Sequence, residues 1–247
     1  MAEPVIERHG PALVVRDDLL AGGSKIRFLP HIVGDAREIV FGGPFCGGAP
    51  YALAVWGARM QTKITLFYAK RKELHWRQRS AFRLGSQLFQ VPAGRMSVVQ
   101  HRARTYAADH GALFLPLGFD LKHATDPFEA VMRDVRDRVG PIDEVWCATG
   151  SGMLARCLGR AFPDARVHGV VVGLRSRNGA QAFPPNVELH DCPYDFAQPC
   201  AVRAPFPSCL NYDAKAWEAM IESKPKTNRV LFWNVAPDVP QELEELK

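Results

Sequence analysis

The sequence has 247 residues, of which 47% are hydrophobic and 23% are charged, a composition that excludes a disordered chain and indicates a soluble globular protein. The longest apolar runs fall short of the ~20 residues of a membrane helix, and the first ten residues are polar and charged, so we expect neither a transmembrane helix nor a signal peptide. The six cysteines are scattered without a C-x-x-C pair. This pattern favours reduced thiols in a cytoplasmic protein and argues against a zinc site.

Short apolar runs alternate with helical stretches over almost the whole length. Taken in chain order, the predicted strands are residues 38–41, 63–68, 87–91, 112–116, 144–148, 166–172 and 230–235. The predicted helices are residues 50–60, 75–84, 96–110, 126–139, 154–162 and 214–223. Alternation of this kind predicts an α/β protein with largely parallel sheets.

The same pattern predicts two domains. A smaller α/β domain of residues 40–118 is inserted into a larger one, which residues 1–39 and 119–247 form together. In open α/β sheets, ligands bind at the carboxyl ends of the strands, so we expect functional residues in the loops that follow strands.

Positive charge is concentrated between residues 70 and 104. This basic block has nine Lys or Arg and one acid, a surplus of eight positive charges in a chain whose net charge is +5. Such a block favours contact with a polyanion, although a solvated helix face gives the same pattern. Trp76 and Phe82 lie among the arginines, where they can stack on bases. The candidate phosphate contacts are Arg77, Arg79 and Arg83.

One lysine follows a glycine turn near the N-terminus, in the segment Gly22-Gly23-Ser24-Lys25. Most lysines are solvated surface cations. At the start of a helix, however, the positive end of the helix and burial both lower the pKa of a lysine and make the neutral amine available for Schiff-base chemistry. Lys25 is therefore a candidate catalytic residue.

Two glycine-rich loops follow predicted strands. Thr149-Gly150-Ser151-Gly152 precedes a predicted helix and can hold a phosphate through exposed amides, hydroxyls and the helix N-terminus. A nucleotide-binding or phosphoribosyl enzyme would use such a loop, and tight strand–helix packing would also require its glycines. The turn at residues 42–48 has the same ambiguity. Within it, Cys46 is either a reactive thiol or a small buried hydrophobe.

The sequence lacks the motifs of several other enzyme classes. The sequence has no G-x-S-x-G, no H-E-x-x-H and no H-x-E with P-C-x-x-C, which argues against hydrolase, zincin and zinc-deaminase activities. The eight histidines do not cluster at ligand spacings. We therefore predict no metal site.

The turn lysine and the two loops together resemble motifs of the fold type II pyridoxal-phosphate enzymes, nearest the branch of aminocyclopropane-carboxylate deaminase and D-cysteine desulfhydrase. In that branch an acidic stretch precedes Gly-Gly-Asn-Lys-x-Arg, and here Asp17-Asp18 precede Gly22-Gly23-Ser24-Lys25-Ile26-Arg27. The resemblance implies two open, mostly parallel sheets flanked by helices. It also implies pyridoxal 5'-phosphate as the cofactor, with Lys25 forming the internal aldimine and shuttling the α-proton.

The glycine turn departs from the family pattern. The family has Gly-Gly-x-x-Ser-Asn-His where this chain has Gly42-Gly43-Pro44-Phe45-Cys46-Gly47-Gly48. The asparagine that supports the cofactor ring oxygen is thus Gly47, and the serine is Cys46. The resemblance still gives Gly47 and Gly48 a cofactor-binding role and makes Cys46 a candidate catalytic residue.

A second family segment resembles residues 210–216. By that resemblance, Asp213 contacts the pyridine nitrogen and keeps it protonated, which strengthens the electron sink. Tyr212 stacks on the substrate or acts as an acid–base group. The cofactor phosphate is held by Thr149, Gly150, Ser151 and Gly152.

The leading hypothesis is a pyridoxal-phosphate enzyme that forms an external aldimine with a primary amine and cleaves a bond at Cα by elimination, deamination or decarboxylation. The altered turn at Cys46-Gly47-Gly48 argues against a conventional pocket for a free amino acid. The basic block favours an amine carried on a modified thymine base in DNA, as in bacteriophages that hypermodify thymine. Two alternatives stay open, a lyase or deaminase of a free small amino acid and a non-catalytic binding protein with the same fold. The resemblance also implies a homodimer.

Overall fold

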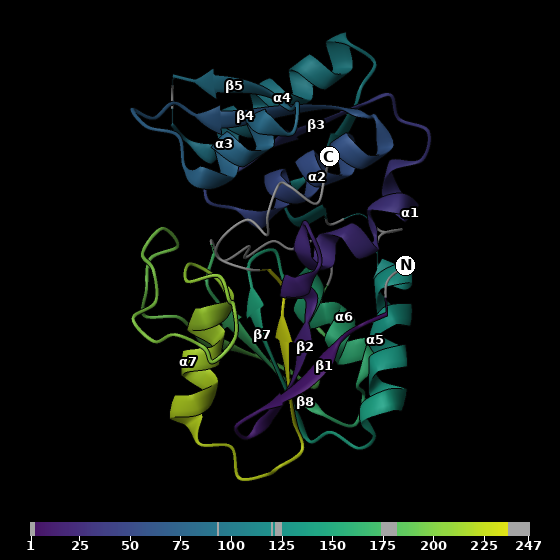
Figure 1. Cartoon of the computed structure of the whole chain (residues 1–247), viewed down its shortest axis with the longest axis vertical. Coiled ribbons are helices and arrows are strands. Elements are labelled where there is room, and N and C mark those ends of the chain that lie inside the picture. The colour runs from purple at the N-terminus through teal and green to yellow at the C-terminus, as the bar shows by residue number, and fades with distance from the viewer. Residues whose placement is uncertain (1–2, 93, 120, 122–124, 174–181, 237–247) are drawn as a thin grey trace. The chain divides into compact units, whose positions relative to one another are not determined.

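A computed structural model of the chain describes residues 3–92, 94–119, 121, 125–173 and 182–236. These residues form two compact units (Figure 1), the first within Met1–Leu20 and Thr125–Val239 and the second within Ala21–Ala124. Among the described residues, no helix has both the length and the apolar character that crossing a membrane requires. The division into a cofactor-binding domain and an inserted domain stays a prediction.

The first unit is built on a six-stranded sheet with the strand order β1-β2-β10-β7-β8-β9. Only β1 is antiparallel to its neighbour, and the other pairs are parallel. The strands are β1 (Ile6–His9), β2 (Ala12–Arg16), β7 (Glu144–Thr149), β8 (Arg166–Val171), β9 (Val187–Asp191) and β10 (Val230–Asn234). Because the central strands are covered on both faces, β7, β8 and β10 read as nearly continuous buried runs.

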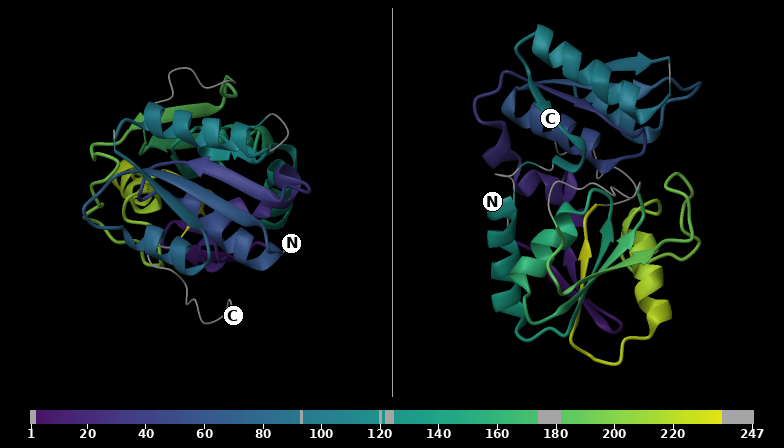
Figure 2. Two further views of the ribbon diagram at one scale, coloured as in Figure 1. Left: turned by 90° about the horizontal axis from the view of Figure 1, so that it is seen from above. Right: turned by 180° about the vertical axis from the view of Figure 1, so that it is seen from behind.

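Helices cover both faces of this sheet (Figures 1 and 2). Helix α7 (Asp213–Ser223) packs on one face, while α5 (Thr125–Val139) and α6 (Met153–Ala161) lie on the other. On the α7 face, Trp217 and Met220 of the helix pack against Trp146 and Phe232 of the sheet. The short 3-10 helix η1 (Asp17–Leu19) follows β2 directly.

The second unit has a four-stranded, fully parallel sheet with the strand order β5-β4-β3-β6. Its strands are β3 (Glu38–Gly42), β4 (Lys63–Ala69), β5 (Gln87–Val91) and β6 (Leu113–Leu115). Its helices are η2 (Gly23–Arg27), α1 (Leu29–Val33), α2 (Gly48–Met60), α3 (Trp76–Arg83), α4 (Met96–Asp109) and η3 (Leu117–Phe119). One core forms where Val99 and Ala103 of α4 pack on Val40 and Phe67 of the sheet. Helix α2 also packs on β4, and Gly57 allows this approach because a Cβ there would lie 2.7 Å from the Thr62 carbonyl oxygen.

The observed elements confirm the predicted α/β fold with two largely parallel sheets. Every helix and strand predicted from the sequence is present, with ends that differ by at most a few residues. The prediction missed β1, β2 and β9. It also placed Lys25 at the start of a helix, whereas Lys25 lies in the middle of η2, and α1 begins only at Leu29.

Candidate functional site

The predicted phosphate loop lies at the carboxyl end of a central strand. Residues 149–152 connect the end of β7 to the start of α6, the position where open α/β sheets bind ligands. Gly152 is the N-cap of α6 with φ +88°, a left-handed conformation that favours glycine. No side chain caps this helix. Its first amides are therefore oriented to donate hydrogen bonds to an anion.

A buried arginine adds positive charge beneath this loop. Arg156 is fully buried in α6, and its Nη1 atom donates to the Ser151 carbonyl oxygen at 3.4 Å. A Cβ on Gly152 would lie 2.8 Å from the same Nη1 atom. The guanidinium and the helix N-terminus both favour a bound anion here. The sequence analysis missed Arg156, although an arginine four residues after Gly152 in a predicted helix places it one turn from the loop.

Tyr212, the residue before α7, packs against the same loop. A Cβ on Gly150 would lie 3.1 Å from the Tyr212 hydroxyl oxygen, so a larger residue there would require the tyrosine to shift by a few tenths of an ångström. Burial raises the pKa of Tyr212, and the charge of the neighbouring Asp213 raises it further. A backbone hydrogen bond from Gly150 lowers this pKa by a smaller amount. The hydroxyl therefore stays protonated at neutral pH and can donate a hydrogen bond.

Asp213 supplies a buried negative charge next to Tyr212. It is the first residue of α7, is fully buried, and its Oδ2 atom accepts a hydrogen bond from the Ala236 backbone N–H at 3.3 Å. Its field also reaches β7, where burial raises the pKa of Cys147 to about 12 with a further contribution from Asp213. Within the first unit, the structure thus brings together the loop at residues 149–152, Tyr212 and Asp213.

The acidic pair of the lysine motif has a structural role in the first unit. Arg16 donates from Nε and Nη2 to the two oxygens of Asp18, each at 2.8 Å, and also binds Glu7. Asp17 accepts a hydrogen bond from the Trp233 indole N–H at 3.2 Å. Arg16, Asp17 and Asp18 are all buried. These contacts fix the chain between β2 and η1, five residues before the segment that carries Lys25.

Lys25 belongs to the second unit and is half-buried. Its helix η2 packs against α2, and a Cβ on Gly22 would lie 3.2 Å from the Ala52 Cα atom. Gly22 has φ +93° and Gly23 has φ +69°, so the chain turns sharply before the lysine. The two glycines of the motif are therefore explained by the turn and by the close approach to α2. The catalytic role of Lys25 stays a prediction.

The predicted cofactor turn precedes the same helix α2. Gly47 is the N-cap of α2, Gly48 is its first residue, and Cys46 is only 3% exposed. The Gly47 N–H donates to the Pro44 carbonyl oxygen at 3.1 Å. A Cβ at Gly47 would lie 3.0 Å from the Pro44 Cγ atom, so the family asparagine would require Pro44 to move. The burial of Cys46 favours the interpretation as a small hydrophobe over that of a reactive thiol.

One of the predicted phosphate contacts needs correction. Arg77 is 4% exposed, and its Nη1 atom donates to the Cys46 carbonyl oxygen at 2.5 Å. This arginine supports the turn from inside and presents no charge to a polyanion, contrary to the prediction. Arg79 and Arg83 of the same helix α3 are exposed.

No protein-family model matches the sequence, and no curated protein matches it significantly. Solved structures are similar along nearly the whole chain. An aminocyclopropane-carboxylate (ACC) deaminase homologue has a TM-score of 0.82 at 16% identity and covers 97% of this chain and 90% of its own. A hydrogen sulfide-producing enzyme from Fusobacterium nucleatum has a TM-score of 0.68 at 13% identity, with 95% and 86% covered. Threonine deaminase isoform 2 from Solanum lycopersicum has a TM-score of 0.69 at 12% identity, with 95% and 76% covered. The fold type II architecture predicted from the motifs is thereby confirmed.

Proposed function

We propose that this protein is a pyridoxal-phosphate-dependent enzyme that acts on a primary amine and cleaves a bond at the carbon bearing that amine, by elimination, deamination or decarboxylation. The observation that carries the proposal is the grouping of an uncapped helix N-terminus, the Tyr212 hydroxyl and a buried carboxylate in one unit. The names of the similar structures, an ACC deaminase homologue, a threonine deaminase and a hydrogen sulfide-producing enzyme, support the reaction class.

The residues present fit this cofactor. When bound, it supplies an electron sink for negative charge that develops at the substrate Cα. The loop at residues 149–152 would hold the phosphate through backbone amides, two hydroxyls and the charge of Arg156. Gly150 and Gly152 allow Tyr212 and Arg156 to approach this loop closely. Asp213 would hold a proton on the ring nitrogen.

Two side chains would handle protons and covalent attachment. Lys25 would hold the cofactor covalently through Nζ and would take or return the proton at the substrate Cα. The Tyr212 hydroxyl would donate a hydrogen bond that orients the substrate. Gly47 and Gly48 would bring the start of α2 close to the cofactor ring.

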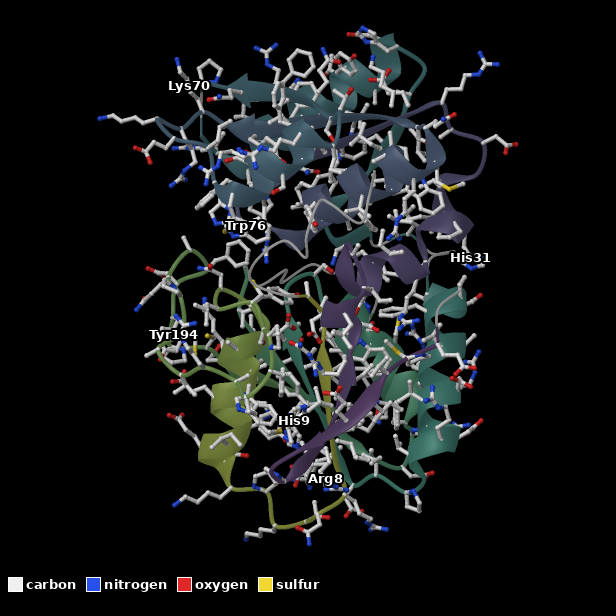
Figure 3. The ribbon with its side chains drawn as sticks, viewed as in Figure 1. Arg8, His9, His31, Lys70, Trp76 and Tyr194 are labelled. Carbon is white, nitrogen blue, oxygen red and sulfur yellow. The ribbon has the colours of Figure 1, made fainter. Side chains whose placement is uncertain are left out.

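The test is covalent attachment at Lys25. We expect the purified protein to show the visible absorption band of bound cofactor, and borohydride reduction followed by peptide mapping to place the added mass on Lys25. Lys25→Ala should lose both signals, because the variant has no amine at this position. Lys70→Ala is the matched control, since Lys70 is an exposed lysine of the same unit (Figure 3) and should leave both unchanged. A protein that stays colourless after reconstitution would overturn the proposal.

We also propose that the substrate amine is carried on a modified thymine base in DNA. The support comes from α3, where Arg79 and Arg83 are exposed and Phe82 between them is 66% exposed. Exposed cations beside an exposed aromatic ring suit a strand whose phosphates are bound and whose bases stack. Trp76, half-buried at the start of the same helix, is labelled in Figure 3. A free small amino acid is the alternative substrate.

DNA binding should therefore be salt-sensitive and depend on α3. Changing both Arg79 and Arg83 to Ala should weaken binding and lower the slope of log affinity against log salt concentration by about 2, since each phosphate contact contributes about 0.9. The measurement is fluorescence anisotropy with labelled DNA over a salt series. Arg203→Ala, which removes one exposed arginine of the first unit, is the control and should leave the slope unchanged. If the affinity for DNA changes neither with salt concentration nor with these substitutions, a free amino acid is the better-supported substrate.

Conversion of an amine substrate distinguishes an enzyme from a non-catalytic binding protein. A protein that binds the cofactor but reacts with no amine would support the non-catalytic alternative. The homodimer stays a prediction, which light scattering of the purified protein tests directly.

A further inference from the structure

Two histidines and a glutamate meet at the edge of the six-stranded sheet, away from the loop at residues 149–152. The Nδ1 atom of His168 lies 2.8 Å from the Nε2 atom of His190. The ligand atoms of His168, Glu188 and His190 all lie within 4.8 Å of one another. Because these residues come from two different strands, their spacing in the sequence does not reveal the cluster, and a metal site here was not predicted.

The pairing of β8 with β9 explains the cluster. The two strands are parallel, with His168 opposite Glu188 and Val170 opposite His190. Side chains two residues apart on a strand point to the same face, so Glu188, His190 and His168 share one face of the sheet. Strand β9 is the edge strand, and Glu188 is exposed while His168 is buried. The cluster therefore has one side in the core and one side open to solvent.

We propose that His168, Glu188 and His190 bind a divalent transition-metal ion, with Zn²⁺ as the best match. Two imidazole nitrogens and one carboxylate oxygen form a donor set that zinc takes in sites with three protein ligands, where water fills the fourth position. With Zn–N bonds of about 2.0–2.1 Å, two nitrogens of a tetrahedral site are about 3.3 Å apart. The observed 2.8 Å needs to open by only about half an ångström.

Neighbouring side chains restrict the His168 ring. Its other nitrogen, Nε2, is buried and lies 3.8 Å from the Glu144 Oε2 atom, which is beyond hydrogen-bond distance. Glu144 accepts a hydrogen bond from the Trp146 indole N–H at 3.0 Å. The Trp146 ring stacks on His168 at a centroid distance of 4.2 Å, which further restricts the imidazole.

Solvent access on one side of the cluster also favours a metal. Glu188 lines a surface pocket together with Glu144 and Arg166, so the cluster is open to solvent at Glu188. The bound ion would join β8 to β9 and hold the edge strand in place.

The experiment measures Zn²⁺ binding to the full, cofactor-loaded chain. Protein stripped of metal with EDTA and freed of excess cofactor is titrated with Zn²⁺ against a chromophoric chelator, and in parallel with Co²⁺, whose visible absorption reports tetrahedral coordination. We expect one ion per chain, a Co²⁺ spectrum of tetrahedral intensity, and a thermal midpoint that rises with Zn²⁺ concentration as binding to the folded state requires.

Variants on the solvent side keep the fold intact. His190→Ala and Glu188→Gln should each weaken Zn²⁺ binding at least as much as the ~10–100-fold loss that even second-shell changes cause. His101→Ala, an exposed histidine of the other unit, is the matched control and should bind as the unchanged protein does. Equal binding by His190→Ala and the control would overturn the proposal, as would the absence of a tetrahedral Co²⁺ spectrum. His168 and His190 would then form a simple hydrogen bond. The result does not depend on the proposed cofactor, since Lys25→Ala should bind the ion equally well.

Discussion

Asp18→Ala is expected to lower the free energy of unfolding of the first unit by about 3 kcal/mol, because it removes the carboxylate from a buried ion pair. Asp18 is fully buried and accepts two hydrogen bonds from Arg16, which is itself buried. Breaking such a pair costs about 3–5 kcal/mol, and we expect the lower end because Glu7 still binds Arg16. Urea denaturation followed by tryptophan fluorescence measures the change.

Two further variants make this prediction specific. Replacing Arg16 and Asp18 together by Met and Leu should cost less than Asp18→Ala alone, because no charge is then left buried. Asp137→Ala removes an exposed carboxylate paired with Arg136 and should change stability by no more than about 0.5 kcal/mol. A loss for Asp18→Ala as small as that of Asp137→Ala would contradict the structural role assigned to the acidic pair.

Asp213→Asn is expected to lower kcat by about 100-fold or more while the cofactor still binds, a loss of the size that follows removal of one preorganised electrostatic group. The asparagine keeps an oxygen that can accept from the Ala236 N–H, so the fold should persist. It carries no negative charge to hold the proton that the proposed function assigns to the ring nitrogen. The measurement is kcat for an accepted amine, or the rate of α-proton exchange into deuterated water followed by NMR.

The control is Asp195→Asn, which neutralises an exposed carboxylate of the same unit. This variant should keep both kcat and the absorption band of the cofactor. If Asp213→Asn retains full turnover, Asp213 only anchors the start of α7. If it loses the cofactor as well, the residue holds the site together and its electronic role is wrong.

Much of the fold could be predicted from the sequence because the central strands are continuous apolar runs and the helices between them carry clear start and stop signals. Two of the three missed strands lack those signals. Strand β1 has only four residues and partly exposed side chains, and β9 is an edge strand whose residues are half-buried or exposed. Strand β2 has the apolar run Ala12-Leu13-Val14-Val15 and was overlooked, and its parallel partner β10 lies more than two hundred residues further along the chain.

Only part of the candidate site could be predicted from the sequence. Glycine loops and a turn lysine are local patterns, so residues 149–152 and Lys25 could be selected from spacing alone. The burial of a side chain depends instead on residues far away in the sequence. Nothing in the sequence distinguishes Arg77, which binds the Cys46 carbonyl oxygen, from its exposed neighbour Arg79. His168 and His190 meet only because β8 pairs with β9 in one register.

The position of β10 has a consequence for how the protein is made. This strand lies between β2 and β7, yet it follows both of them in the chain. During synthesis, one edge of β2 and one edge of β7 therefore stay unpaired until Val230–Asn234 leaves the ribosome. All strands of the second unit lie within Glu38–Leu115 and can pair earlier. A nascent or truncated chain that stops before Val230 would present two unpaired strand edges to other chains. Chaperone protection should accordingly matter most for the first unit, and aggregation of truncated products should begin there.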